Sequence, residues 1–161
     1  METAKVELKT EVIGEENHTY EIRRTWDESK GGCLIVELYP TIAINTTDVA
    51  CMDLSTMHLL AHLSELGEFG KISVCNLFSM VCANGKPSAT SLRMDSKNLS
   101  YIEGILDEKK TEDFPVILAW GNSLSKNKTT IEMKKDLLKM LLEKGYEDKT
   151  YCLTADEFPE K

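Results

Sequence analysis

The segment Cys33-Leu34-Ile35-Val36-Glu37-Leu38 is a short, nearly continuous apolar run with β-branched residues at its centre. A run of this kind is typical of a strand that is buried on both faces of a sheet. Three later segments share its character: Ile72-Ser73-Val74-Cys75-Asn76-Leu77-Phe78, Pro115-Val116-Ile117-Leu118-Ala119-Trp120 and Tyr151-Cys152-Leu153. The sequence therefore predicts four buried strands over about residues 33–154.

Helical patterns separate these strands. Residues 52–66 carry leucines at helical spacing up to Gly67, and residues 99–106 carry a weaker pattern that Gly104 interrupts. A third pattern runs from about Thr129 to Lys144, with Gly145 as its C-cap. Its expected inward residues are Ile131, Leu137, Leu138, Leu141 and Leu142. The order β-α-β-α-β-α-β predicts a three-layer α/β/α fold with a mostly parallel central sheet of four parallel strands.

An antiparallel hairpin is predicted ahead of this core, over about residues 5–25. Apolar and polar residues alternate on both sides of the polar turn Gly14-Glu15-Glu16-Asn17, from Val6 to Val12 and from His18 to Ile22. The chain has 161 residues, a length typical of one domain, so we expect a single α/β domain over residues 1–161.

Composition excludes several classes of protein. The net charge of −8 opposes the non-specific phosphate attraction on which most DNA-binding surfaces rely. The five cysteines are odd in number and form no Cys-x-x-Cys pair, which indicates reduced, mostly buried thiols rather than disulfides or a zinc site. No run is long enough to span a membrane, and the N-terminus lacks the layout of a signal peptide, so we expect a cytoplasmic protein without membrane contact.

Ligands of open parallel sheets bind beyond the carboxyl ends of the strands. Segments rich in small or hydrogen-bonding residues follow each predicted strand, the last of them Thr154-Ala155-Asp156. Turns at such positions are rich in these residues in any case, and both interpretations stay open. Asn76 is the best candidate for recognition, because an amide donates and accepts hydrogen bonds at once. The predicted binding residues are Tyr39, Pro40, Thr41, Asn76, Phe78, Trp120, Gly121, Asn122 and Ser123.

Two further patterns suggest ion binding only weakly. The segment from Gly121 to Thr129 lacks the second glycine of a phosphate loop, although Ser123, Ser125, Lys126 and Lys128 leave a looser anion site open at the start of the next helix. His58 and His62 lie one helical turn apart and could bind a metal ion with Cys51 or Asp53. A structural histidine pair is the favoured interpretation, and we expect no metal and no cofactor.

The residues Tyr20, Arg23, Arg24 and Trp26 form a local basic and aromatic concentration. They could stack a base and pair with a phosphate. The favoured alternative is that Trp26 covers the sheet edge and the arginines pair with the abundant acidic residues.

The chain carries an ordered set of short elements: Arg24-x-Trp26, Leu38-x-Pro40-Thr41, Asp53-x-Ser55-Thr56, Val74-x-Asn76-Leu77-Phe78, Ala119-Trp120-Gly121 and Cys152-Leu153-x-x-x-x-Phe158-Pro159. Over about residues 20–159 this set resembles an uncharacterised bacterial and phage family, catalogued as domain of unknown function 1643. In the family the first strand usually ends in Asn-Pro-Ser-Thr, whereas this chain has Tyr39 and Thr41 in place of the asparagine and serine. The acid-Pro-Thr element has become residues 53–56, and a final His-Pro pair is missing.

The layout is more remotely similar to that of uracil-DNA glycosylases, which place an Asp-Pro or Asn-Pro element after an early strand. They also carry an apolar-Trp-Gly element like residues 117–121 and a late His-Pro-Ser element. By this resemblance Tyr39 stands where a water-orienting acid or amide would be. A phenol does not readily replace a carboxylate, since it normally ionises near pH 10.

The sequence therefore predicts a non-catalytic or weakly catalytic binder of a nucleobase, nucleotide or nucleic-acid end, with no assigned catalytic residue. One alternative is a glycosylase-like N-glycosidase or nucleotide hydrolase in which Asn76, Asp53 or Asp156 orients water. Another is an acidic protein-interaction module acting on a DNA-processing partner.

Overall fold

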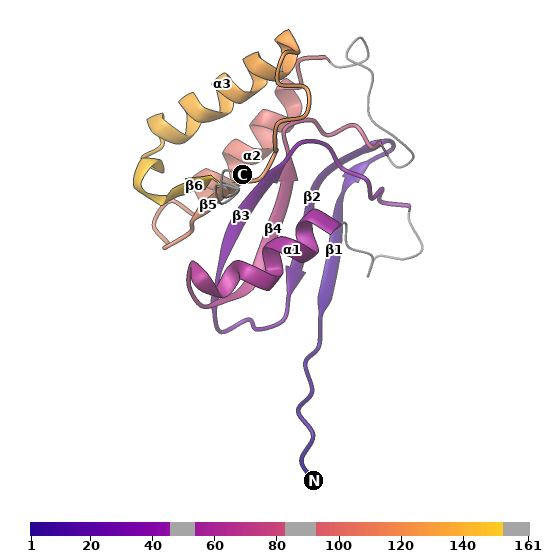
Figure 1. The fold of residues 1–161 in the computed structure, drawn as a ribbon, viewed down its shortest axis with the longest axis vertical. Coiled ribbons are helices and arrows are strands. Elements are labelled where there is room, and N and C mark those ends of the chain that lie inside the picture. Colours follow the sequence, from indigo (N-terminus) through magenta and orange to yellow (C-terminus); the bar gives the residue numbers. More distant parts are fainter. Residues whose placement is uncertain (46–53, 83–92, 153–161) are drawn as a thin grey trace, which may run out of the picture.

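In the computed structural model, residues 1–45, 54–82 and 93–152 are described. Six strands form one sheet in the order β1-β2-β4-β3-β5-β6 (Figure 1). The strands are β1 (Lys9–Glu15), β2 (His18–Thr25), β3 (Gly31–Glu37), β4 (Phe69–Asn76), β5 (Val116–Leu118) and β6 (Thr150–Cys152). The helices are α1 (Leu54–His62), α2 (Ser96–Glu108) and α3 (Lys128–Glu143), with 3-10 turns η1 (Leu63–Glu65) and η2 (Glu147–Lys149).

The sheet combines a parallel and an antiparallel part. Strand β3 pairs in parallel with β4 on one side and with β5 on the other, and β5 pairs in parallel with β6. Strands β1 and β2 form the predicted antiparallel hairpin. Strand β2 also pairs with β4 in antiparallel orientation and so joins the hairpin to the rest of the sheet. The mixed α/β class, the four parallel strands and the hairpin are thereby confirmed.

The alternation of β3 places its side chains in two separate apolar clusters. Leu34 and Val36 pack with α2 and α3, whereas Cys33 and Ile35 pack with Leu59 of α1. In Figure 1, α1 crosses the sheet on the near side, while α2 and α3 lie beside each other. Because both faces of β3 carry core contacts, consecutive residues from Cys33 to Val36 are apolar instead of alternating with polar ones.

Two predicted strands differ from expectation. Strand β1 begins at Lys9, so Val6 and Leu8 precede it and are exposed. Strand β6 forms where expected but is not buried, since Tyr151 is 46% exposed. Its position explains this difference, because β6 is an edge strand that pairs with β5 alone.

The inward face of α3 is rotated from the prediction. Leu137 and Leu141 are buried as expected, but Ile131, Leu138 and Leu142 are exposed. The buried set also contains Thr130 and Met133, which fall with Leu137 and Leu141 on one stripe of helical period. Each mispredicted residue lies one position, about 100°, beyond a member of that stripe. The C-cap of α3 is Lys144, and the predicted cap Gly145 follows it with a φ of +79°, a left-handed conformation that ends the helix.

Helices α2 and α3 are tied together by Tyr146, which follows α3. Its Oη donates a hydrogen bond of 2.5 Å to the carbonyl oxygen of Leu106 in the last turn of α2. The side chain is 2% exposed, and burial raises the pKa of its phenol. This bond satisfies a carbonyl that the end of α2 leaves without a helical partner.

We expect Tyr146→Phe to lower the free energy of unfolding by about 1–2 kcal/mol, because it leaves that carbonyl buried without its donor. Urea denaturation measures the loss. Tyr151→Phe is the matched control, since the Tyr151 ring is exposed and should give no measurable change. Equal stability of both variants would show that the bond contributes nothing.

Candidate functional site

Strands β3, β4 and β5 all have their carboxyl ends at the same end of the sheet. We call this end of the sheet the rim. The pairing continues past the strands, because Leu77 N donates to Glu37 O at 2.9 Å and Ala119 N to Val36 O at 2.7 Å. Farther out, Cys82 N donates to Pro40 O at 2.8 Å. The segments that carry Tyr39, Asn76 and Trp120 therefore leave the sheet at the same end.

Asn76, the predicted recognition residue, ends β4 and is 2% exposed. Its carbonyl oxygen accepts a hydrogen bond of 2.7 Å from Nδ2 of Asn98 in α2, which also donates to Leu77 O at 3.1 Å. Within the described residues, Oδ1 of Asn76 and Oδ1 of Asn98 are buried and have no hydrogen-bond partner. The rim thus contains two buried acceptors that no group in the described part of the chain satisfies.

Glu37, the last residue of β3, is a buried carboxylate that the sequence analysis did not propose as a site residue. It is 7% exposed, lies opposite Asn76 in the β3–β4 register, and its Oε1 accepts a hydrogen bond of 2.9 Å from Thr56 Oγ1 in α1. A charged residue inside an otherwise apolar strand was the available signal.

The two aromatic residues of the predicted site are both half-buried. Tyr39 and Trp120 pack against the cluster that contains Leu34 and Val36. Nζ of Lys134, on α3, lies 5.4 Å from the centroid of the Trp120 ring, and burial lowers the pKa of this lysine. Within the described residues Lys134 forms no ion pair, so the rim also has a partly desolvated cation.

The remaining predicted residues divide between core and surface. Phe78 is 3% exposed and belongs to the core cluster, and Pro40 is buried. Thr41, Asn122, Ser123 and Gly121 are exposed, and Gly121 has a φ of +65°. None of the cavities that we describe within residues 1–45, 54–82 and 93–152 is lined by Tyr39, Asn76 or Trp120.

A serine, a histidine and an aspartate lie close together near the rim. Ser79 Oγ donates to Asp95 Oδ2 at 2.6 Å and lies 2.8 Å from Nδ1 of His18. The aspartate thus contacts the serine instead of the histidine, and Ser79 is fully buried. In a nucleophilic triad the acid orients the histidine and the serine is open to substrate. The role of this cluster is structural, because Asp95 also caps α2 by accepting from Asn98 N.

The looser anion site and the histidine pair have different outcomes. Asn127 caps α3 with its own side chain, whose Oδ1 accepts from Thr130 N at 2.8 Å and so occupies part of the helix N-terminus. The exposed residues His58 and His62 have ring centroids 5.3 Å apart, and Nδ1 of His62 lies 3.1 Å from Glu65. Among the described residues no three ligands group around a metal position, and Cys51 and Asp53 lie outside them.

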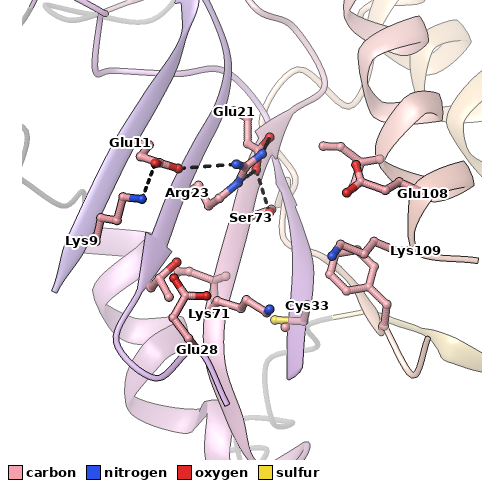
Figure 2. A pocket seen from close by; sticks show the side chains of 15 residues that line it. Lys9, Glu11, Glu21, Arg23, Glu28, Cys33, Lys71, Ser73, Glu108 and Lys109 are labelled. Carbon is pink, nitrogen blue, oxygen red and sulfur yellow. Dashed lines mark hydrogen bonds and ion pairs between the residues drawn. The ribbon is translucent and has the colours of Figure 1, made fainter. Parts of the chain in front are cut away.

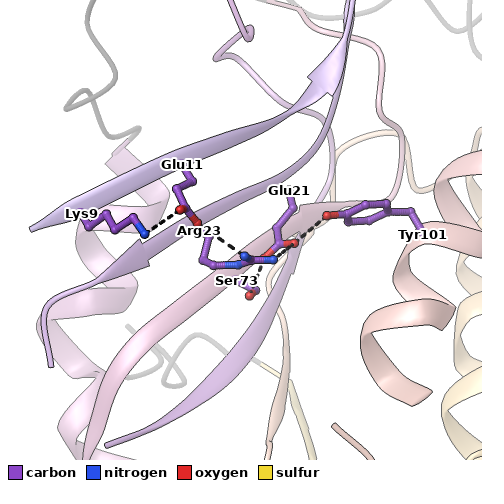
Figure 3. A network of polar contacts seen from close by, with 6 residues as sticks. All are labelled: Lys9, Glu11, Glu21, Arg23, Ser73 and Tyr101. Carbon is purple, nitrogen blue, oxygen red and sulfur yellow. Dashed lines mark hydrogen bonds and ion pairs between the residues drawn. The ribbon is translucent and has the colours of Figure 1, made fainter. Parts of the chain in front are cut away.

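Arg23, in the basic and aromatic concentration of β2, pairs with an acidic residue, as the favoured interpretation expected. The guanidinium of Arg23 donates from Nε (2.9 Å) and Nη2 (3.0 Å) to the two carboxylate oxygens of Glu21, which is 1% exposed (Figure 3). Trp26 packs against the core cluster of Ile35 and Leu59. Arg24 is itself buried.

Glu21 anchors a polar network that crosses from β1 to α2. Ser73 Oγ donates to its Oε2 at 2.8 Å, and Tyr101 Oη donates to its Oε1 at 2.7 Å (Figure 3). Burial, together with this hydrogen bond, raises the pKa of Tyr101. This network was not predicted from the sequence. Its partners are up to 80 residues apart in the chain.

Among the described residues, no helix has both the length and the apolar character that a membrane span needs. The four described cysteines are free thiols, and Cys33 and Cys75 are buried. Burial raises the pKa of Cys33 to about 12, which removes it as a nucleophile near neutral pH.

Comparison with known families identifies a match over most of the chain. Residues 19–160 match the family described as "Protein of unknown function (DUF1643)". No curated protein and no solved structure matches the chain. The match covers most of the 161 residues and includes β2 except for His18, together with every later strand. The chain belongs to the DUF1643 family.

Proposed function

We propose that this protein binds a mononucleotide at the rim, with the base near Asn76 and the phosphate near Lys134. The observation that carries the proposal is the buried Oδ1 of Asn76, which has no partner among the described residues. A buried acceptor without a partner costs about 1–3 kcal/mol. An N–H group on a bound base would remove that cost, and base edges pair donors with acceptors as an amide does.

Lys134 supports the phosphate half of the proposal. Its ammonium group is partly desolvated beside Trp120 and forms no ion pair in the described part of the chain. A phosphate oxygen would supply the missing opposite charge through a charge-assisted hydrogen bond. The half-buried Trp120 would also offer an aromatic surface next to the ligand.

The spacing of the strands favours a nucleotide over a free base. Strand β3 separates β4, which carries Asn76, from β5, which precedes Trp120. Neighbouring strands lie about 4.8 Å apart, so these two strand ends are separated by about 10 Å. A mononucleotide spans such a distance between its base and its phosphate, whereas a free base reaches one of the two positions.

Thermal-shift and calorimetric titration with nucleobases, nucleosides and nucleoside monophosphates would test this function. We expect nucleotides to stabilise the protein most; a ligand at 100 times its dissociation constant adds about 2.7 kcal/mol of stability. Asn76→Ala should abolish the shift for all three ligand types. Lys134→Gln should lower the affinity for nucleotides by about tenfold and leave the affinity for nucleosides unchanged.

Lys71→Gln is the control for these variants, because Lys71 lies on β4 like Asn76 but near its other end. Circular dichroism checks that each variant is folded. If Asn76→Ala binds every nucleotide as tightly as the unmodified protein, Asn76 is not part of the site. If no nucleotide binds the unmodified protein, the proposal is wrong.

A second candidate function, hydrolysis of an N-glycosidic bond, is favoured by Glu37. Such a reaction needs a polar group that positions water, and Glu37 is a carboxylate at the end of β3 that Thr56 holds by a hydrogen bond. Asp53 and Asp156, the acids expected for this role, lie outside the described residues. Release of free base from nucleosides or uracil-containing DNA, lost in Glu37→Gln, would establish hydrolysis; absence of release would leave binding alone.

A further inference from the structure

A cavity of about 280 Å³ lies away from the rim, near the amino ends of β3 and β4. We call it the polar cavity. Residues of β1, β2 and β4 form one side of it, and the end of α2 forms the other (Figure 2). Its volume is near the lower limit of the roughly 300–1,000 Å³ typical of small-molecule sites, which suits a ligand smaller than a nucleotide.

Arg23 enters the polar cavity with a fixed orientation. Its Nε and Nη2 atoms are both bound to the buried carboxylate of Glu21, which Ser73 and Tyr101 hold in turn. The third nitrogen, Nη1, makes a longer contact of 3.4 Å with Glu11 Oε2. A guanidinium held in this way loses little entropy when it binds a further anionic group.

Lys71 contributes a second cation, from β4. Its side-chain stem lies against β3 at Gly32, where an added Cβ would be 2.8 Å from Lys71 Cγ. Within residues 1–45, 54–82 and 93–152, Lys71 forms no ion pair. The glycine therefore lets the lysine lie close to the sheet, with its charge unpaired inside the cavity.

Two carboxylates of the polar cavity are also unpaired. Glu28 and Glu108 both line it and form no ion pair in the described part of the chain. Figure 2 shows the Glu108 carboxylate and the Lys109 ammonium directed from α2 toward the side chains of β2 and β4. The other lining charges have partners: Lys9 pairs with Glu11 at 2.9 Å, and Lys109 with Glu112 at 3.5 Å.

The charges of the lining restrict the ligand. Four basic side chains (Lys9, Arg23, Lys71, Lys109) face four acidic ones (Glu11, Glu21, Glu28, Glu108). A simple anion would be attracted by Lys71 but repelled by the two unpaired carboxylates. A simple cation would be repelled by Lys71. A small molecule that carries both charges satisfies each unpaired group.

We propose that the polar cavity binds a free α-amino acid as its zwitterion. Its carboxylate lies between Arg23 Nη1 and the Lys71 ammonium, and its ammonium lies toward Glu28 and Glu108. Ile105 and Phe114 also line the cavity and give the amino-acid side chain an apolar wall. Aliphatic amino acids therefore fit better than charged ones. The site is separate from the rim and does not depend on nucleotide binding.

Isothermal titration of the full chain with alanine, valine and leucine tests the proposal, with three further probes. These are the N-acetyl amino acid, which lacks the ammonium group, the amino-acid methyl ester, which lacks the carboxylate, and inorganic phosphate. We expect the free amino acid to bind and each blocked form to lose about tenfold or more in affinity, since each loses a charged hydrogen bond. Phosphate should not compete.

Variants assign the two halves of the ligand. Lys71→Gln should weaken the binding of the free amino acid and of the N-acetyl form but leave the binding of the methyl ester unchanged. Glu108→Gln should weaken the binding of the free amino acid and of the methyl ester but leave the binding of the N-acetyl form unchanged. Lys110→Gln is the matched control, since Lys110 lies next to Lys109 but outside the cavity lining. The proposal is overturned if no aliphatic amino acid binds, if the blocked forms bind as tightly as the free ones, or if phosphate competes for the site.

Discussion

Replacement of Arg23 by methionine should lower the free energy of unfolding by about 3 kcal/mol, because it leaves the Glu21 carboxylate buried without its cation. Glu21 is 1% exposed and would retain only the hydrogen bonds from Ser73 and Tyr101 within the described network. The expected loss is at the lower end of the usual range for a broken buried pair. The Arg23 side chain is 44% exposed, and water already screens part of the interaction.

Urea denaturation of four proteins isolates this pair. They are the unmodified chain, Arg23→Met, Glu21→Gln and the double variant. The double variant should recover most of the stability that Arg23→Met loses, because a neutral amide needs no cation. Lys9→Met, which breaks the exposed Lys9–Glu11 pair, is the control and should leave the stability unchanged. A loss no greater in Arg23→Met than in Lys9→Met would refute the role given to Arg23.

Gly70→Ala should also destabilise the protein strongly, by about 3 kcal/mol. A Cβ at Gly70 would lie 2.0 Å from the backbone oxygen of Asp27. The two segments are held at this short separation because Gly70 O accepts hydrogen bonds from Trp26 N at 2.8 Å and from Asp27 N at 3.0 Å. Relief of the clash would require movement of backbone, since no flexible side chain is available to give way.

Gly31→Ala, at the start of β3, is the matched control. An added Cβ at Gly31 meets nothing within 4 Å, so its effect on stability should stay within about 0.5 kcal/mol. Thermal or urea unfolding of both variants under one condition makes the comparison. Similar stability of the two variants would contradict the close backbone approach between Asp27 and Gly70.

The sequence predicted the strands that have the strongest patterns. The run around Ile35 and the run around Val74 are central strands, and their continuous apolar character follows from burial on both faces. The burial of β6 was mispredicted, because a three-residue apolar segment does not reveal whether it lies at the centre or at the edge of a sheet. The face of α3 was mispredicted in part, since two of its leucines lie on the true stripe and two lie one position beyond it.

The role of the candidate site stays a prediction, but the placement of its segments at one end of the sheet could be predicted. The convergence of Tyr39, Asn76 and Trp120 follows from parallel topology, which the alternation of strands and helices indicates. The Glu21 network and the placement of Lys134 beside Trp120 were not predictable. They depend on the register between β2 and β4 and on the rotation of α3, neither of which a single sequence specifies.

The pairing of β4 between β2 and β3 has a consequence for biosynthesis. The hairpin of β1 and β2 is complete by Thr25, yet its partner in the sheet ends at Asn76, and the second neighbour of β3 ends at Leu118. A nascent chain that leaves the ribosome must therefore hold one edge of β2 and both edges of β3 unpaired until later segments emerge. Pairings between distant segments close slowly, so the newly made amino-terminal part is the stage most exposed to chaperones and to aggregation.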